Sequence, residues 1–70
     1  MAEPQWKKME ADIAECLAKW GVPGVTTSFR NDTAYLESQV RTDYERFRAE
    51  MAAKSIPEVR YIINRIRVER

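Results

Sequence analysis

The sequence predicts an α+β domain with the element order αββαβ, a two-layer sandwich in which two helices cover one face of a three-stranded sheet. Three observations predict it. Apolar residues recur at three- and four-residue spacing in two segments. Strict alternation marks two short segments between them, and a β-rich run follows the second helix after a proline turn. The 70 residues are enough for one domain over residues 1–70, with its core within about 12–68.

The first predicted helix carries one apolar stripe, made of Trp6, Met9, Ile13, Cys16, Leu17 and Trp20. Glu3 and Pro4 favour its start, because proline is tolerated in the first turn and a carboxylate stabilises the positive end of the helix dipole. Gly21 is expected to end the helix with a left-handed backbone, and Pro23 prevents its continuation. Because Cys16 lies on the stripe, we expect it to act as a small buried hydrophobic residue.

A hairpin is predicted next. Val25, Thr27 and Phe29 alternate with polar residues, and the pair Asn31-Asp32 tolerates the positive φ angles of a tight turn. The second strand alternates again. Its predicted inward residues are Ala34, Leu36, Ser38 and Val40, and its outward residues are Tyr35, Glu37, Gln39 and Arg41.

The second helix is predicted over Thr42–Ser55, where Thr42 and Glu45 fit a capping box and Pro57 stops the helix nearby. Its predicted buried stripe is Tyr44, Phe47, Met51 and Ala52, and the residues expected in solvent are Arg46, Arg48, Glu50 and Lys54. The final strand lies in the run Val59–Val68, with Ile62, Asn64, Ile66 and Val68 inward. If this strand pairs in parallel with the second strand, the two strands and the helix between them form a βαβ unit.

Composition argues against catalysis. The chain is 44% apolar and 33% charged, has a net charge of +1, contains no histidine and has a single cysteine. It lacks a phosphate loop and a serine-nucleophile motif. Asp12 and Glu15 are three residues apart on one helix, but they lie among lysines and are expected to be solvated charges. We therefore expect no enzyme, no metal site and no cofactor.

The outward residues of the sheet are the first candidate for a function. Tyr, Ile and Arg together are enriched in protein interfaces, so the candidate partner-binding residues are Tyr35, Tyr61, Ile63, Arg65 and Arg67. A protein partner or a second copy of the chain is the leading expectation. Tyrosine and arginine can also stack on single-stranded bases, but the motifs of common RNA-binding folds are absent, and nucleic acid ranks third.

Two further surfaces are alternative candidates. Trp6, Lys7 and Lys8 form a candidate membrane-contact site, because tryptophan beside lysine is typical of helices that lie on anionic phospholipid. The last strand is β-rich and can lie at a sheet edge, where it could add a partner strand. Its arginines could equally protect such an edge against aggregation.

The pattern from about Asp12 to Val68 resembles the BON domain family. The family has an amphipathic helix, a hairpin with a Val-x-Leu-x-Gly-x-Val strand, a helix ending in alanines, a Pro-Gly-Val turn and a strand similar to Val-x-Asn-x-Leu-x-Val. The corresponding segments here are Ala34–Val40, Ala52-Ala53, Pro57-Glu58-Val59 and Ile62–Val68. The residues that stand in place of family glycines are Asp32, Ser38 and Glu58.

The resemblance implies a non-catalytic binding module of the bacterial envelope. The family is credited with phospholipid contact, osmotic protection and protein assembly, and similar domains occur in ring components of type III secretion systems. On this basis the expected location is the periplasm, as part of a longer protein. A cytoplasmic location is the alternative, because no signal peptide is visible in the sequence.

Overall fold

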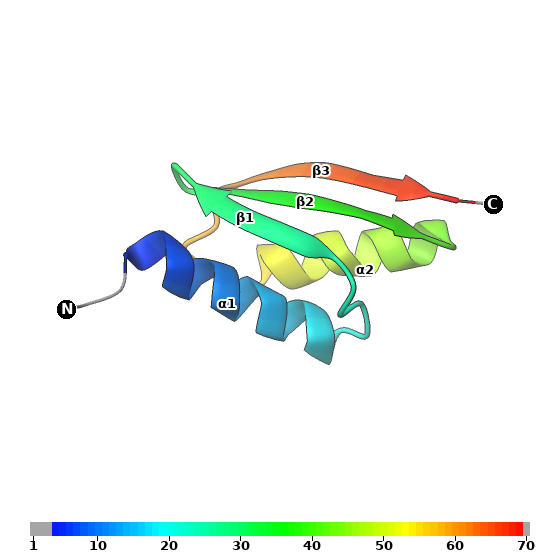
Figure 1. Ribbon diagram of the computed structural model, residues 1–70, viewed down its shortest axis with the longest axis horizontal. Coiled ribbons are helices and arrows are strands. Elements are labelled where there is room, and N and C mark those ends of the chain that lie inside the picture. Colours follow the sequence, from blue (N-terminus) through cyan, green and yellow to red (C-terminus); the bar gives the residue numbers. More distant parts are fainter. Residues whose placement is uncertain (1–3, 70) are drawn as a thin grey trace.

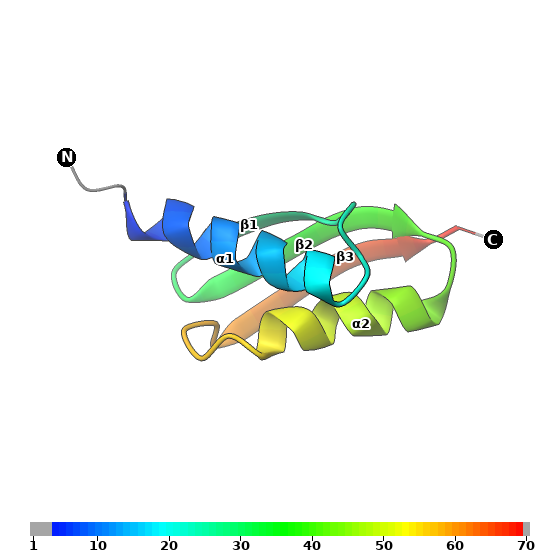
Figure 2. The ribbon, with the colours of Figure 1, turned by 90° about the horizontal axis from the view of Figure 1, so that it is seen from below.

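The chain forms two layers, a sheet and a pair of helices that both cover the same face of it (Figures 1 and 2). The computed structural model describes residues 4–69. The elements follow the predicted order αββαβ, which confirms the fold class. Their bounds are Gln5–Lys19 for α1, Thr26–Arg30 for β1, Thr33–Val40 for β2, Asp43–Lys54 for α2 and Tyr61–Val68 for β3.

The sheet has the order β1-β2-β3, so β2 lies in the centre and the other two strands form the edges. β1 and β2 pair antiparallel, whereas β2 and β3 pair in parallel, which confirms the predicted βαβ unit. α1 packs against β1, α2 packs against β2 and β3, and the two helices contact each other. Figure 2 shows the helices side by side in front of the sheet, and Figure 1 shows both on one side of it with no helix on the other.

α1 begins and ends close to the predicted positions. Pro4 is the N-cap, and Glu3 lies outside the described residues. At the other end the Gly21 amide donates to the Ala18 carbonyl at 3.0 Å, and the Val22 amide donates to the Leu17 carbonyl at 2.9 Å. These two bonds are the Schellman pattern, and Gly21 has the left-handed φ of 84° that this cap requires.

The tight hairpin turn forms without glycine. Asn31 and Asp32 have φ angles of 52° and 61°, a conformation that both side chains tolerate. Asp32 therefore meets the backbone requirement at one position where the BON pattern has glycine. Ser38, at the second such position, turns its hydroxyl to donate to the Gly24 carbonyl at 3.2 Å. At the third position Glu58 is exposed, and its φ angle is not positive.

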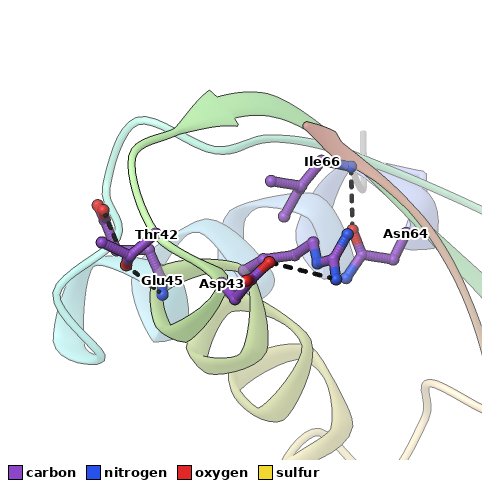
Figure 3. Close-up of polar contacts among 6 residues, drawn as sticks. Thr42, Asp43, Glu45, Asn64 and Ile66 are labelled. Carbon is purple, nitrogen blue, oxygen red and sulfur yellow. Dashed lines mark hydrogen bonds and ion pairs between the residues drawn. The ribbon is translucent and has the colours of Figure 1, made fainter. Parts of the chain in front are cut away.

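The capping box predicted for α2 is present (Figure 3). Thr42 is the N-cap, and its hydroxyl accepts from the Glu45 amide at 3.1 Å. The Glu45 carboxylate accepts from the amide of Arg41 at 3.2 Å, one residue before the amide that the standard box uses. Ser55 is the C-cap. The helix therefore spans Asp43–Lys54, inside the predicted range.

The core lies between the two layers. Ile13, Leu17 and Leu36 are its largest fully buried side chains, and Phe29 and Ile66 close it from the two edge strands. The predicted inward faces of all three strands are confirmed, although Ile62, Asn64 and Val68 are only half-buried because β3 is an edge strand. Cys16 is also half-buried rather than buried, and its sulfur lies 3.8 Å from the Ser55 hydroxyl at the rim of the core.

The stripe predicted for α2 is wrong. Tyr44 and Phe47 are 63% and 55% exposed, and Met51 is half-buried. Of the predicted stripe only Ala52 is buried, and it is joined by Ala49 and Ala53. The physical reason is space: α2 contacts α1, β2 and β3 together, and alanines allow such close approach whereas aromatic side chains do not. The aromatic residues therefore lie on the outer side of the helix.

Candidate functional site: the open face of the sheet

The face of the sheet that no helix covers is the candidate site, and we call it the open face. Side chains alternate across a strand, so residues that neighbour the core residues Phe29, Leu36 and Ile66 point to the opposite side. The strand residues of the open face are Thr26, Ser28, Arg30, Thr33, Tyr35, Glu37, Gln39, Tyr61, Ile63, Arg65 and Arg67. All five predicted partner-binding residues are therefore on one surface.

One half of the open face is aromatic and apolar. The strand register places Tyr35 beside Ile63 and Thr33 beside Tyr61. Tyr61 and Ile63 are 65% and 39% exposed, and Tyr35 is half-buried. The Arg30 guanidinium lies over the Tyr35 ring at 5.8 Å from its centroid, which orients the cation across the face. On this half of the open face, the exposed side chains of Tyr61 and Ile63 therefore lie next to Tyr35, whose ring is in contact with the Arg30 guanidinium.

The other half of the open face is basic. Arg65 lies opposite Glu37 in the register, and Arg67 lies opposite Gln39. These four side chains, together with Thr26 and Ser38, line a shallow hollow with a volume of about 690 Å³. Within residues 4–69, Arg65 and Arg67 have no ion-pair partner. Two guanidinium groups with free donors can therefore receive carboxylate oxygens from a partner.

The helices differ from the open face in their charge. α1 contains three lysines and three carboxylates, and α2 contains three cations and three carboxylates, so each helix is neutral. Ion pairs join Lys19 to Glu15 at 3.4 Å on α1 and Lys54 to Glu50 at 3.7 Å on α2. Another joins Arg46 to Asp43 at 3.6 Å (Figure 3). The strand residues of the open face, in contrast, carry three arginines and one glutamate, a net charge of +2.

On the free edge of β3, one backbone amide is bonded to a side chain of the same strand. The Tyr61 amide donates to the Asp32 carbonyl at 3.1 Å and the Glu69 amide to the Val40 carbonyl at 2.7 Å. Alternation then directs the amides of the even-numbered residues of β3 away from β2. One of them, the Ile66 amide, donates to the Asn64 side-chain oxygen at 3.0 Å (Figure 3).

The free edge of β1 is covered in the same manner. Arg30 and Thr33 flank the two-residue turn and pair across it, so the amide of Phe29 points away from β2. That amide donates to a carboxylate oxygen of Glu10 on α1 at 3.0 Å. Each edge strand therefore has an outward amide already bonded to a side chain, which leaves fewer donors for a partner strand.

The candidate membrane-contact residues lie at the start of α1. Trp6 is 47% exposed, Lys7 and Lys8 are exposed, and the Lys7 ammonium lies 5.9 Å from the centroid of the Trp6 ring. Trp6 also lines an open groove of about 760 Å³ between α1, the hairpin turn and the segment that follows α2. The three residues are thus adjacent and accessible, on a helix whose total charge is zero.

Residues considered for other chemistry have ordinary surroundings. Glu15 is bonded to Lys19, and Asp12 is half-buried on the same helix. Within residues 4–69 no group of three or more His, Cys, Asp or Glu side chains could hold a metal ion. Neither described helix has the length and hydropathy needed to span a bilayer.

Sequence reasoning missed the contacts of Arg48, which was expected in solvent. Its guanidinium donates to the Trp20 carbonyl at 2.6 Å and to the Tyr44 hydroxyl at 3.1 Å. It also lies 5.7 Å and 5.5 Å from the centroids of the two rings. Arg48 therefore connects the C-terminal end of α1 to α2, and Tyr44 is held on the outer surface. The alanines Ala49, Ala52 and Ala53 form a second stripe that could point inward, and only that choice places Tyr44 on the outer side of the helix.

The comparisons with known proteins identify no family, since no family model matches the chain and no curated protein matches it. The resemblance to BON domains therefore stays a prediction.

Proposed function

We propose that this protein is a non-catalytic binding and assembly module that docks a protein on its open face. The observation that carries the proposal is the pair Tyr61 and Ile63, two large apolar side chains exposed beside Tyr35 on a sheet face that no helix covers. Exposed aromatic anchors with flanking arginines are the side chains that contribute most to protein interfaces.

The shape of the surface supports docking of a protein rather than turnover of a small molecule. The open face is broad and its hollow is shallow, whereas small-molecule sites are concave and enclose most of the ligand. The edges support the same choice, because Asn64 and Glu10 already occupy outward amides of β3 and β1. The face is therefore a better docking surface than a strand edge.

The setting we propose is the one that the resemblance to BON domains implies, the bacterial envelope. There the module would act within a larger periplasmic protein or a secretion-type ring. The observed order of helices and strands is the one that this resemblance implies. It is the order and spacing of the segments, rather than a family match, that support it.

The experiment uses two tyrosines with almost equal exposure. A photo-crosslinking amino acid is placed at position 61 on the open face or at position 44 on the outer side of α2, where the tyrosines are 65% and 63% exposed. In the native host we expect a discrete crosslinked product from position 61 and none of the same size from position 44. Ile63→Ser in the first protein should remove at least nine-tenths of that product, because it deletes a neighbouring anchor.

Absence of a product at position 61, or identical products from both positions, would contradict the proposal. Sedimentation equilibrium distinguishes a second copy from another protein. If the partner is a second copy, Tyr61→Ala/Ile63→Ser should weaken self-association about tenfold or more while the circular dichroism spectrum stays unchanged.

A second candidate function is binding to anionic phospholipid, favoured by the exposed Trp6 with Lys7 and Lys8 beside it. Co-sedimentation with vesicles that contain anionic lipid tests it. The variant Trp6→Ala/Lys7→Glu/Lys8→Glu should lose binding that the parent protein shows. Equal, negligible binding by both proteins would rule out this function.

A further inference from the structure

We propose that the open face selects an acidic partner, a protein segment that presents carboxylates beside an apolar side chain, and that it disfavours a second copy of itself. This inference rests on the proposed function and names the chemistry of the partner. It follows from where the structure places charge, since the open face carries +2 while the whole chain carries only +1.

The first step is that the positive charge of the open face is available. On the helices, Lys19, Lys54 and Arg46 have carboxylate partners within 4 Å. Arg65 and Arg67 have none among residues 4–69, although Glu37 lies opposite Arg65 in the register. Their donors face solvent, so a partner carboxylate can bond to them without displacing an existing ion pair.

The second step is the arrangement of the two halves. Along β3, Tyr61 and Ile63 are followed by Arg65 and Arg67 on the same face, and successive residues on one face are about 6.5–7 Å apart. An extended segment that lies along this strand direction would meet the apolar anchors first and the guanidinium groups next. The complementary segment therefore has an apolar residue and, two to four residues away, one or more acidic residues.

The third step is that charge opposes two alternative occupants, a second copy of the chain and nucleic acid. A two-fold pairing of open faces would bring two surfaces of +2 together, which like-charge repulsion opposes. Nucleic acid would bring a row of phosphates against a face whose central position is held by Glu37, on a protein with a net charge of only +1. A segment with one or two carboxylates matches the local charge without these conflicts.

The test is a selection from a random library of 12-residue peptides on the immobilised protein at low salt. We expect the wild-type protein to enrich Asp and Glu together with Leu, Phe or Trp. The charge-reversed variant Arg65→Glu/Arg67→Glu should enrich Lys and Arg instead. The matched control Lys7→Glu/Lys8→Glu reverses two charges on α1 and should keep the acidic preference. All three proteins should show the same circular dichroism spectrum, because the four substituted side chains are exposed.

Binding of one selected peptide then gives a magnitude. Arg65→Gln/Arg67→Gln should raise the dissociation constant of this peptide about tenfold, because the variant lacks two exposed charge contacts. Raising the salt concentration should weaken peptide binding by the wild-type protein more than peptide binding by this variant. Lys7→Gln/Lys8→Gln should change the constant less than twofold.

The outcomes separate the inference from the proposed function. Enriched peptides without an acidic bias, or with a bias that charge reversal leaves unchanged, would overturn the acidic partner and keep docking on the face. A library from which nothing is enriched would contradict both. Dimerisation through the open face at low salt would also overturn the inference. So would binding of a 20-nucleotide oligothymidylate or anionic vesicles more tightly than the peptides, in a manner lost in Arg65→Glu/Arg67→Glu.

Discussion

The orientation of α2 in the structure and the apolar pattern of its sequence give different expectations for the effect of truncating Phe47. The pattern places Phe47 in the core, whereas the structure leaves it 55% exposed and buries Leu36 completely. We predict that Leu36→Ala strongly destabilises the fold and that Phe47→Ala does not. The comparison is sharp because a buried phenylalanine would be the more damaging of the two truncations.

The magnitudes follow from burial. Truncating a fully buried leucine to alanine costs about 2–5 kcal/mol. A chain of this length has a total unfolding free energy of roughly 4–10 kcal/mol, so Leu36→Ala removes a large part of it. For Phe47→Ala the loss of partial contacts is offset by the higher helix propensity of alanine, roughly 0.5 kcal/mol. The net change should stay within about 1 kcal/mol.

Urea denaturation followed by circular dichroism measures both changes. The midpoint of Leu36→Ala should fall well below that of the parent protein, and the midpoint of Phe47→Ala should stay close to it. Ala52→Leu provides the converse test, because a larger side chain at this fully buried position should cost about 1–3 kcal/mol or more. If Phe47→Ala destabilised as much as Leu36→Ala while Ala52→Leu was tolerated, α2 would have its aromatic side inward and the structure would be wrong there.

Two other substitutions have expected effects on stability. The Thr27 hydroxyl is buried and has no hydrogen-bond partner among residues 4–69, so Thr27→Val should stabilise the fold by about 1 kcal/mol and raise the melting temperature by several degrees. A lower melting temperature would show that the hydroxyl has a partner. Thr42→Ala removes the oxygen that accepts from the Glu45 amide and should cost about 1 kcal/mol, whereas Thr42→Ser should keep most of the stability. Equal urea midpoints for the two variants would contradict a capping role.

The fold was predictable because each element shows its own period and its own ends. The alternation in β1 and β2, the positive-φ pair Asn31-Asp32 and the cap at Gly21 are all local features, and local features can be read from the sequence. The open face followed from the same alternation once both helices were assigned to one side of the sheet. The outward orientation of its five candidate residues could therefore be read from the sequence, whereas their role in binding stays a prediction.

The rotation of α2 could not be read in this way. Tyr44, Phe47 and Met51 form an apolar stripe by spacing, and the alanines form another, so the helix has two faces that could point inward. Which face wins depends on how closely α1, β2 and β3 approach the helix, a tertiary property. The contacts of Arg48 with Trp20 and Tyr44 depend on the same approach, which is why its predicted exposure was wrong.

Asn64 shows how the edges and the open face are related. An amide in the inward row of β3, between Ile62 and Ile66, would be an unfavourable choice for a closed core. It is explained by its hydrogen bond to the Ile66 amide, which points out of the sheet and would otherwise be available to another strand. Glu10 does the same for Phe29 at the other edge, although it belongs to a helix. Because one outward amide at each edge already has a side-chain partner while Arg65 and Arg67 of the open face have no ion-pair partner among residues 4–69, recognition by this domain should depend more on side chains than on added strands.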